Sequence, residues 1–330
     1  MRAWQVTRHG EPQDVLSCVE CPPPPLREDT VRIAVDAAGL GLPDVFLCRG
    51  SYAFRPQFPF TPGQEVVGRV IESCEGGPPV GSRVMAVTAF FLGHGGFADE
   101  ALALSSSTFD APETLGDAEA AGFCIPYHTA WVGLVNRGRL QAGETLVVTG
   151  ASGSSGAAAV QVGKALGARV VALAGDAGKR ALCERLGADE VVDSGTDDLS
   201  GAIRAATAGR GADVVFDVVG GQTFMACTRS LANEGRLLAV GYASGAWANA
   251  STARMVQTNA SVLGVYVGAY DRAQMEAVHA AVVAQKASGA IAPPPTREWG
   301  FEALPEALQQ LADRAALGKT VVRVRTPAGG

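Results

Sequence analysis

The chain has 330 residues, which is enough for two domains of ordinary size. It is 47% hydrophobic and 18% charged with a net charge of −6, which disfavours nucleic acids and anionic membranes as partners because both select basic surfaces. No charge-free stretch of about 18 apolar residues is present, and the first residues lack the apolar centre of a signal peptide. We therefore expect a cytoplasmic protein without a nucleic-acid or membrane partner.

Seven cysteines are scattered along the chain, and their odd number favours reduced thiols over a disulfide framework. Cys18 and Cys21 have the spacing of a metal-binding pair. No second pair or histidine cluster in the sequence completes the four ligands that a zinc site needs. We expect no metal at this pair.

The first 120 residues contain short strand patterns that are interrupted by proline and glycine, at residues 31–37, 65–71, 82–88 and 97–104. Alternating apolar runs between turn residues are typical of an irregular antiparallel β domain. The sequence therefore predicts a mainly antiparallel β domain in this part of the chain.

From about Gly122 onward, strand and helix patterns alternate. Strand patterns lie at residues 145–149, 169–174, 190–192, 214–218, 236–240 and 261–267. Helix patterns lie at 157–167, 178–186, 199–207 and near 224–231, and the chain ends with helices at 272–288 and 305–317 and a strand at 320–325. Apolar strands separated by helices predict an α/β fold with a doubly wound parallel sheet of the Rossmann type.

The most informative segment is TLVVTGASGSSG at residues 145–156, where an apolar strand runs into a glycine-rich turn before a helix. Glycine lets the backbone approach a phosphate, and the first N–H groups of the helix point towards it. Gly153 and Gly156 take the last two glycine positions of a dinucleotide-binding turn, and Gly156 is expected to let the helix pack on its strand. A plain glycine-rich turn is the alternative, which the strand–helix–strand context disfavours.

The end of the second strand distinguishes the two nicotinamide cofactors. An NAD-binding site carries an acid there for the ribose 2′-hydroxyl, whereas this strand runs into Gly175. Lys179 and Arg180 follow and can neutralise a 2′-phosphate. Asp176 lies about 20 residues past Gly156, where an NAD-type acid is expected, but beyond the strand end. We favour NADPH, with NADH as the alternative.

Ordered motifs along nearly the whole chain resemble one family. They include RGSYAFRP, PFTPGQEVVGRV, GGFADEALA, AAGFCIPYHTAW, GRLQAGETLVVTGASGSSG, LGADEVVD, GADVVFDVVGG, GRLLAVGYASG and GKTVVRV. The chain resembles the zinc-independent quinone oxidoreductase (zeta-crystallin-like) branch of the medium-chain dehydrogenase/reductase superfamily. The resemblance implies a GroES-like catalytic domain at residues 1–121, a Rossmann domain at 122–268 and a return to the catalytic domain at 269–330. It also implies a cofactor cleft between domains and a homodimer formed through edge strands, here residues 262–267.

The same resemblance assigns cofactor contacts by position. Thr129 is expected at the nicotinamide, and Gly175 and Lys179 at the 2′-phosphate. The pyrophosphate is expected at Gly153, Ser154, Ser155 and Gly156. The adenosine and nicotinamide-ribose path is expected along Val218, Val240, Gly241, Tyr242, Ala243, Tyr266, Val267 and Gly268. The chain departs from the family at Ser194, where a tyrosine is frequent, and at Gly41, where an asparagine is frequent.

No catalytic zinc is expected, because the ligand positions of the zinc-dependent relatives fall on Gly41, on Gln64 and near Ile125, and Cys124 is one place off. Without a Lewis acid, reduction of an electron-poor acceptor is easier than oxidation of an alcohol. We expect hydride transfer from NADPH to a quinone or an α,β-unsaturated carbonyl compound, a small hydrophobic acceptor. Tyr52 is the candidate proton donor, and a role in shaping the pocket is equally open.

Five phenylalanines are candidates for an apolar acceptor pocket or for the protein core: Phe54, Phe58, Phe60, Phe90 and Phe91. Two other functions remain open. One is a non-catalytic nucleotide-binding protein, either crystallin-like or sensing. The other is a zinc alcohol dehydrogenase, which the missing ligands disfavour.

Overall fold

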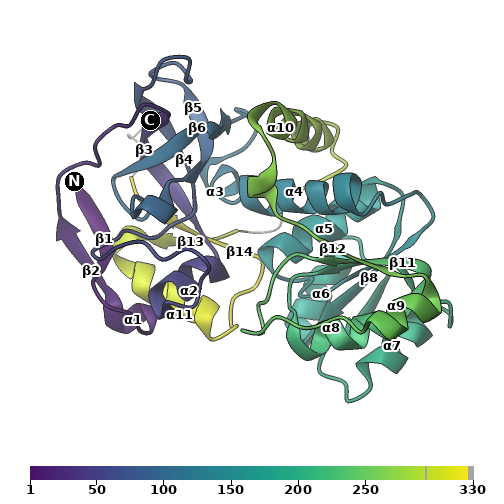
Figure 1. The fold of residues 1–330 in the computed structure, drawn as a ribbon. Helices are drawn as coiled ribbons and strands as arrows, with labels where there is room; N and C mark the ends of the chain where they lie inside the picture. The colour runs from purple at the N-terminus through teal and green to yellow at the C-terminus, as the bar shows by residue number, and fades with distance from the viewer. Residues whose placement is uncertain (294–295, 326–330) are drawn as a thin grey trace. The chain divides into compact units, whose positions relative to one another are not determined.

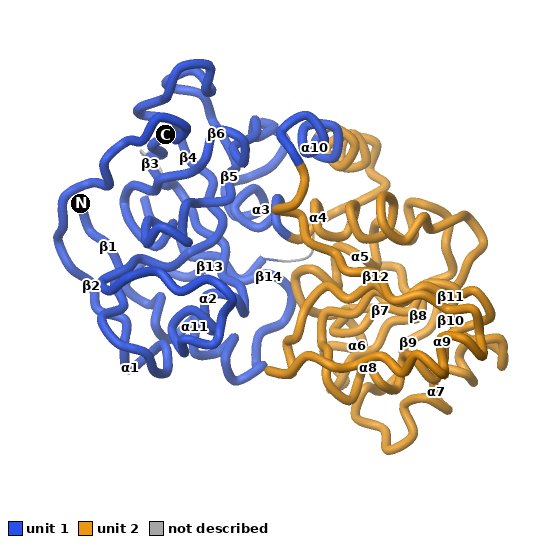
Figure 2. Tube along the Cα trace, in the orientation of Figure 1, with its two compact units in different colours: residues 1–125, 271–279, 295–330 blue, residues 126–270, 280–294 orange. Residues whose placement is uncertain are grey.

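The computed structural model describes residues 1–293 and 296–325. These residues form two compact units (Figure 2). Of the described residues, unit 1 contains 1–125, 271–279 and 296–325, and unit 2 contains 126–270 and 280–293. The sequence placed the domain limits at 121/122 and 268/269, and it did not separate residues 280–293 from the catalytic domain.

Unit 1 is built on a six-stranded sheet with the order β13-β14-β3-β4-β5-β6 and an additional β3–β6 pairing (Figure 1). The strands are β3 (Thr30–Leu40), β4 (Glu65–Ser73), β5 (Arg83–Thr88), β6 (Glu100–Asp110), β13 (Thr296–Gly300) and β14 (Lys319–Arg323). All pairings are antiparallel except β13 with β14. Because β14 pairs with β3, the end of the chain returns to the N-terminal sheet, as the resemblance implied.

In the described part of unit 1, a hairpin and the helices α1, α2, α3 and α11 accompany this sheet. Of these helices, the sequence patterns predicted only α11, at residues 305–317. The elements are β1 (Arg2–Val6), β2 (Leu16–Glu20), α1 (Pro12–Val15), α2 (Leu42–Arg49), α3 (Asp117–Ala120) and α11 (Leu304–Ala312). For α2 the signals were present: Pro43 lies in its first turn, and Gly50 ends it in the left-handed region with φ +68°.

Unit 2 contains a six-stranded parallel sheet with the order β12-β11-β10-β7-β8-β9. Its strands are β7 (Thr145–Val148), β8 (Arg169–Ala174), β9 (Glu190–Asp193), β10 (Ala212–Asp217), β11 (Leu231–Ala239) and β12 (Ser261–Gly264). The order reverses between β7 and β10, and in such sheets the carboxyl ends of the strands at the reversal form the ligand-binding crevice.

The helices of unit 2 connect these parallel strands (Figure 1). They are α5 (Ser154–Ala165), α6 (Ala177–Arg185), α7 (Leu199–Ala206), α8 (Gly221–Thr228) and α9 (Thr252–Thr258). Helix α4 (Cys124–Trp131), which begins in unit 1, precedes the first strand of the sheet. Ile203 of α7 and Phe224 of α8 share one buried cluster with Val147 and Val215 of the sheet. The predicted doubly wound α/β sheet and the β-rich first domain are confirmed by this topology.

The last strand of the parallel sheet is shorter than predicted. β12 ends at Gly264, not at Val267, and Val267–Ala269 form a 3-10 turn. The neighbouring β11 ends at Ala239, whose carbonyl accepts from Val265 N at 3.0 Å. The strand prediction failed here because the apolar run continues after the partner strand has ended.

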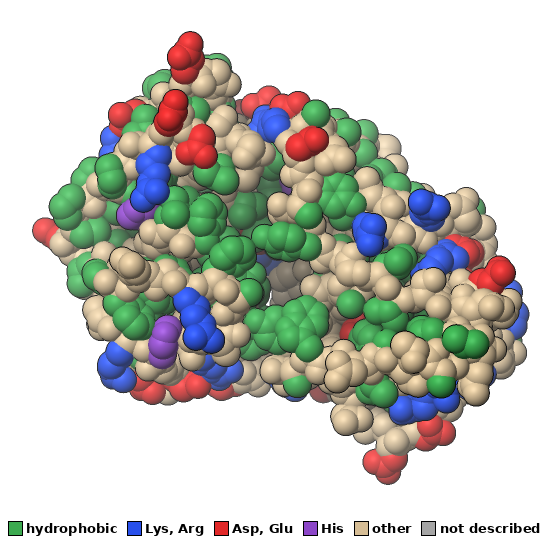
Figure 3. Space-filling view, viewed as in Figure 1, with side chains coloured by type: hydrophobic (Ala, Val, Ile, Leu, Met, Phe, Trp, Pro, Cys, Tyr) green, Lys and Arg blue, Asp and Glu red, His purple; other side chains and the backbone are tan. Residues whose placement is uncertain are grey.

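The distribution of charged side chains on the surface of the described residues agrees with the negative net charge of the chain. Figure 3 shows Lys and Arg side chains mixed with acidic ones over one face, without a continuous basic surface. Among the helices of residues 1–293 and 296–325, none combines the length and hydropathy needed to cross a bilayer. The seven cysteines, which all lie in this part of the chain, are free thiols.

Candidate functional site

The N-terminus of α5 offers backbone hydrogen-bond donors in unit 2. Its N-cap is Gly153, an exposed residue without a side chain to accept from the first-turn N–H groups. At α6 and α7, by contrast, the N-cap acids Asp176 and Asp198 accept from backbone N–H groups at 3.0 and 2.8 Å. Because helix N-termini attract anions, α5 is suited to a phosphate group from outside the chain.

Gly156 allows α5 to lie against the turn before it. A Cβ atom at Gly156 would lie 2.2 Å from Gly150 O and 2.8 Å from Ala151 Cα. Close contact with the strand occurs instead at Gly163, where a Cβ would lie 2.5 Å from Leu146 Cδ2. Gly156 therefore permits the close approach of α5 to the turn that follows β7, and Gly163 permits the approach to the strand itself.

Thr149 and Asp217 join the ends of β7 and β10 at the strand reversal. The hydroxyl of Thr149 donates to Asp217 Oδ1 at 2.6 Å, and the carboxylate also accepts from the N–H groups of Val219 and Gly220 at 3.1 Å. Burial raises the pKa of Asp217, while these hydrogen bonds lower it. Sequence reasoning missed this pair, although both residues stand at carboxyl ends of predicted strands.

The residues expected along the adenosine and ribose path lie at this same edge of the sheet. Val240 N and Gly241 N donate to Asp217 O at 2.9 and 3.2 Å, and Ala243 N donates to Val218 O at 3.0 Å. The ring of Tyr242 lies 4.6 Å from that of Trp247. The remaining predicted residues on this path are Tyr266, Val267 and Gly268, which follow the end of β12.

The 2′-phosphate candidates lie at the end of β8 and the start of α6. Asp176 lies beyond the strand, as predicted, and caps α6. Its pKa is lowered by the Lys179 backbone N–H and by the Lys179 ammonium, which lies 3.1 Å from Oδ2. Arg180 donates to Gly175 O and to Asp193 Oδ2, the latter at 3.0 Å. Both predicted cations are therefore paired with acids here, and a phosphate on Lys179 must compete with Asp176.

The structure also places Ser194 and Thr129. Ser194 lies beside Gly175, since a Cβ atom there would meet Ser194 Oγ at 3.8 Å. Thr129 is half-buried on α4.

The aromatic residues of unit 1 form two groups instead of one pocket. The half-buried Tyr52 has its ring 6.0 Å from that of Phe54 and 6.3 Å from that of Phe90, and Phe54 lies 6.1 Å from Phe91. Phe58 instead stacks on Phe60 at 5.6 Å. Tyr52, Phe54, Phe90 and Phe91 are therefore the set that can line an apolar surface together.

Two buried acids lie beside Gly41 and Gln64, which occupy the positions of zinc ligands in the zinc-dependent relatives. The carboxylate of Asp44 accepts from Gly41 N at 2.9 Å and from Gly63 N at 3.0 Å. Glu65 is paired with Lys319, and its second oxygen accepts from Ile125 N at 3.0 Å. This buried polar group holds the N-terminus of α2 and the start of β4 in place.

Asp44 gives the stability of the protein a defined pH dependence. Burial raises the pKa of this carboxyl from its ordinary 3.8 to about 7, against the opposing effect of its two backbone hydrogen bonds. A group whose pKa is raised on folding stabilises the fold at low pH and loses that contribution as the pH rises to the folded value.

We therefore expect the free energy of unfolding of the native protein to fall, relative to that of Asp44→Asn, as the pH rises from about 4 to about 7, and the difference to stay constant above. Chemical denaturation of both proteins across this range measures it. A difference that does not change with pH would show that Asp44 titrates near its ordinary value.

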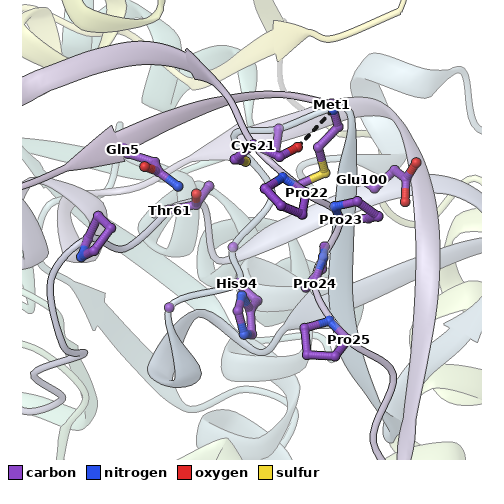
Figure 4. Close-up of a pocket in the computed structure, with 14 residues that line it drawn as sticks. Met1, Gln5, Cys21, Pro22, Pro23, Pro24, Pro25, Thr61, His94 and Glu100 are labelled. Carbon is purple, nitrogen blue, oxygen red and sulfur yellow. Dashed lines mark hydrogen bonds between the residues drawn. The ribbon is translucent and has the colours of Figure 1, made fainter.

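A cavity of about 410 Å³ lies elsewhere in unit 1 (Figure 4). Met1, Gln5, Cys21, Thr61, His94, Glu100 and the run Pro22 to Pro25 contribute to its wall. Burial lowers the pKa of His94. The lining contains none of the predicted site residues, so the cavity is separate from the groups described above.

Two family models match the chain. The alcohol dehydrogenase GroES-like domain matches residues 27–113, and the zinc-binding dehydrogenase domain matches residues 156–284. The chain is 34% identical over 272 residues to quinone oxidoreductase-like protein 2 of Bos taurus, covering 82% of this chain and 77% of the relative. It is 30% identical over 306 residues to the Nematostella vectensis homologue of that protein, covering 89% and 82%.

A solved structure extends the similarity to the whole fold. The quinone oxidoreductase of Thermus thermophilus, also determined in complex with NADPH, matches with a TM-score of 0.80 and 30% identity over 98% of this chain and 100% of that chain. Fold, strand-reversal site and relatives together define an oxidoreductase. The chain belongs to the quinone oxidoreductase branch of the medium-chain dehydrogenase/reductase superfamily.

Proposed function

We propose that this oxidoreductase binds NADPH on unit 2 and reduces a quinone or an α,β-unsaturated carbonyl compound without a metal ion. The N-terminus of α5, which is capped by Gly153 at the strand reversal, supports this proposal most strongly. The NADPH complex of the Thermus relative supports the choice of cofactor.

The residues at the turn fit a dinucleotide. The first-turn N–H groups of Ser154 and Ser155 would bind the pyrophosphate, with Gly153 and Gly156 leaving room for it. Gly175 and Lys179 would hold the 2′-phosphate, and Thr129 would contact the nicotinamide. The other proposed contacts are Val218, Val240, Gly241, Tyr242, Ala243, Tyr266, Val267 and Gly268.

Bound NADPH supplies a hydride to an electron-poor carbon of the acceptor. The chain must then provide an apolar surface for that acceptor and a proton for its oxygen. Tyr52 is the proposed proton donor, with water as the alternative, and the aromatic group around it in unit 1 would exclude solvent.

Metal independence rests on the side chains at the zinc-ligand positions. Gly41 and Ile125 cannot bind a metal through their side chains, and a glutamine amide is a poor zinc ligand. Cys124 and His128 lie one turn apart and buried on α4, which makes them the place to look for a metal ion. Burial raises the pKa of the Cys124 thiol well above its usual range, so a metal ion bound there would have to displace the thiol proton.

The function is tested by following NADPH oxidation with a panel of quinones and enones, before and after dialysis against a chelator. We expect turnover with members of the panel, no dependence on added metal, and no stoichiometric zinc by elemental analysis. Tight NADPH binding without turnover of any acceptor would instead indicate a non-catalytic nucleotide-binding protein. Loss of activity on chelation would indicate a metal enzyme.

Lys179→Ala is expected to raise KM for NADPH roughly ten- to a hundredfold, because a charge-assisted contact with a phosphate contributes about 1.5–3 kcal/mol. KM for NADH, which has no 2′-phosphate, should change little. Steady-state kinetics with both coenzymes measure the two values. Equal effects on NADPH and NADH would contradict the role proposed for Lys179.

We also propose a cytoplasmic homodimer joined through the edge strand β12. Among the described strands, β12 borders only β11 in its sheet, and the exposed side chain of Tyr266 follows its end. Sedimentation of the purified protein tests this assembly, and a monomer at micromolar concentration would contradict it.

A further inference from the structure

The side-chain amide of Gln64 is buried without a hydrogen-bond partner. The residue is 6% exposed, and its Nε2 has no partner among the described residues. Gln161 also has an unpartnered Nε2, but its Oε1 accepts from Ala292 N at 2.7 Å and from the Tyr127 hydroxyl at 3.3 Å. Buried amides are nearly always hydrogen-bonded, so the Gln64 Nε2 is a donor that is open to a ligand or a water molecule.

The backbone around Gln64 is held firmly. Gly63 N donates to Asp44, and Gly63 O accepts from Thr88 Oγ1 at 2.6 Å and from Gly96 N at 2.8 Å. Thr88 N donates to Gln64 O at 2.9 Å. Gly63 N, Gly63 O and Gln64 O thus have partners within the fold, whereas Gln64 Nε2 does not. Such rigid support is what an orienting hydrogen-bond donor needs.

The adjoining residue Gly41 leaves space. A Cβ atom there would meet only Pro43 Cδ at 3.3 Å and Asp44 Oδ2 at 3.7 Å, both from its own helix. Because the same carboxylate binds Gly41 N and Gly63 N, the open position at Gly41 and the residue before Gln64 lie on either side of Asp44. A Cβ at Gly41 would thus contact only atoms of α2.

We propose that the Gln64 amide donates a hydrogen bond to the carbonyl oxygen of the acceptor, and that it thereby selects acceptors that carry such an oxygen. This inference rests on the proposed function. When hydride adds to the electron-poor carbon, the π electrons of the conjugated carbonyl move to the oxygen, which then takes a proton from Tyr52 or water. Gln64 keeps its own proton and stabilises the developing negative charge.

The test replaces Gln64 with leucine and measures the reduction of 1,4-naphthoquinone by NADPH. We expect kcat/KM for the quinone to fall roughly a hundredfold, as when one oxyanion donor is lost. KM for NADPH should stay within about twofold. The melting temperature should stay constant or rise, because leucine removes an unsatisfied buried amide. A purely structural glutamine would instead show a lower melting temperature with kcat/KM retained.

A matched control and a second variant accompany this test. Gln309→Leu also removes a glutamine in unit 1 with a buried unpartnered atom, Oε1, and should leave quinone reduction unchanged. Gln64→Met gives the same comparison if the leucine variant does not fold. In the complex with NADP⁺ and carbonyl-labelled quinone, infrared spectroscopy measures the stretching frequency of the quinone carbonyl. This frequency should be lower in the native protein than in the Gln64 variants, because a hydrogen bond to the oxygen weakens the carbonyl bond.

The measurements distinguish an error in the proposed reductase function from an error in the proposed role of Gln64. If the native protein oxidises NADPH with no quinone or enone, the proposed function is wrong and this inference falls with it. If the native protein is active but the Gln64 variants retain kcat/KM within about twofold and show the same carbonyl stretch, only the role of Gln64 is wrong.

Discussion

Gly156→Ala is expected to weaken NADPH binding far more than Gly153→Ala. The added Cβ at Gly156 would lie 2.2 Å from Gly150 O and 2.8 Å from Ala151 Cα, and these atoms belong to the backbone of the turn. Relief requires α5 to move away from the turn that positions its N-terminal N–H groups. Overpacking of this kind costs about 1–3 kcal/mol, or roughly a ten- to hundredfold rise in Kd if it falls on the bound state.

Gly153→Ala is the comparison on the same turn, because its added Cβ meets no backbone clash and can weaken binding only by crowding the pyrophosphate itself. Its Cβ would lie 3.4 Å from Gly150 O, an ordinary contact, and its φ of −84° suits any residue. Calorimetric titration of both variants with NADPH, together with their melting temperatures, separates loss of binding from loss of folding. Similar affinities for the two variants would mean that the close approach at Gly156 does not shape the site.

Lys319→Met is expected to lower the free energy of unfolding of unit 1 by about 3–5 kcal/mol, because it leaves the Glu65 carboxylate buried without its counter-ion. Both side chains are almost fully buried, at 6% and 4% exposed. Replacing both partners, as in Lys319→Met with Glu65→Leu, should recover much of the loss, since no buried charge remains.

The recovery in that double variant should be incomplete, because Ile125 N loses the carboxylate oxygen that accepts its hydrogen bond. Denaturation of the native protein, the two single variants and the double variant gives the coupling energy of the pair. A loss below about 1 kcal/mol for Lys319→Met would show that water reaches Glu65 and replaces the ammonium.

Local patterns predicted much of unit 2. β8 was predicted with its observed bounds, and β7 and β9 to within one residue, because buried parallel strands are near-continuous apolar runs. The start of α5 was placed three residues too late, at Ala157, since serine and glycine favour turns. Because α5 begins at Ser154, both Ser154 and Ser155 lie in its first turn, where their N–H groups are available as donors.

Interactions between distant residues were not predictable from these patterns. Glu65 and Lys319 are 254 residues apart, and Thr149 and Asp217 are 68 apart. Their pairing depends on strand order, which local periodicity does not encode. In the same way, the sequence showed Lys179 and Arg180 as available cations, whereas the fold pairs them with Asp176 and Asp193.

A crystal structure of the protein with NADPH would show where the dinucleotide binds. We predict the pyrophosphate against the N–H groups of Ser154 and Ser155, and the 2′-phosphate on the Lys179 ammonium in place of Asp176. A nucleotide bound elsewhere on unit 2, with the N-terminus of α5 facing only solvent, would overturn the proposed phosphate-binding role of this helix.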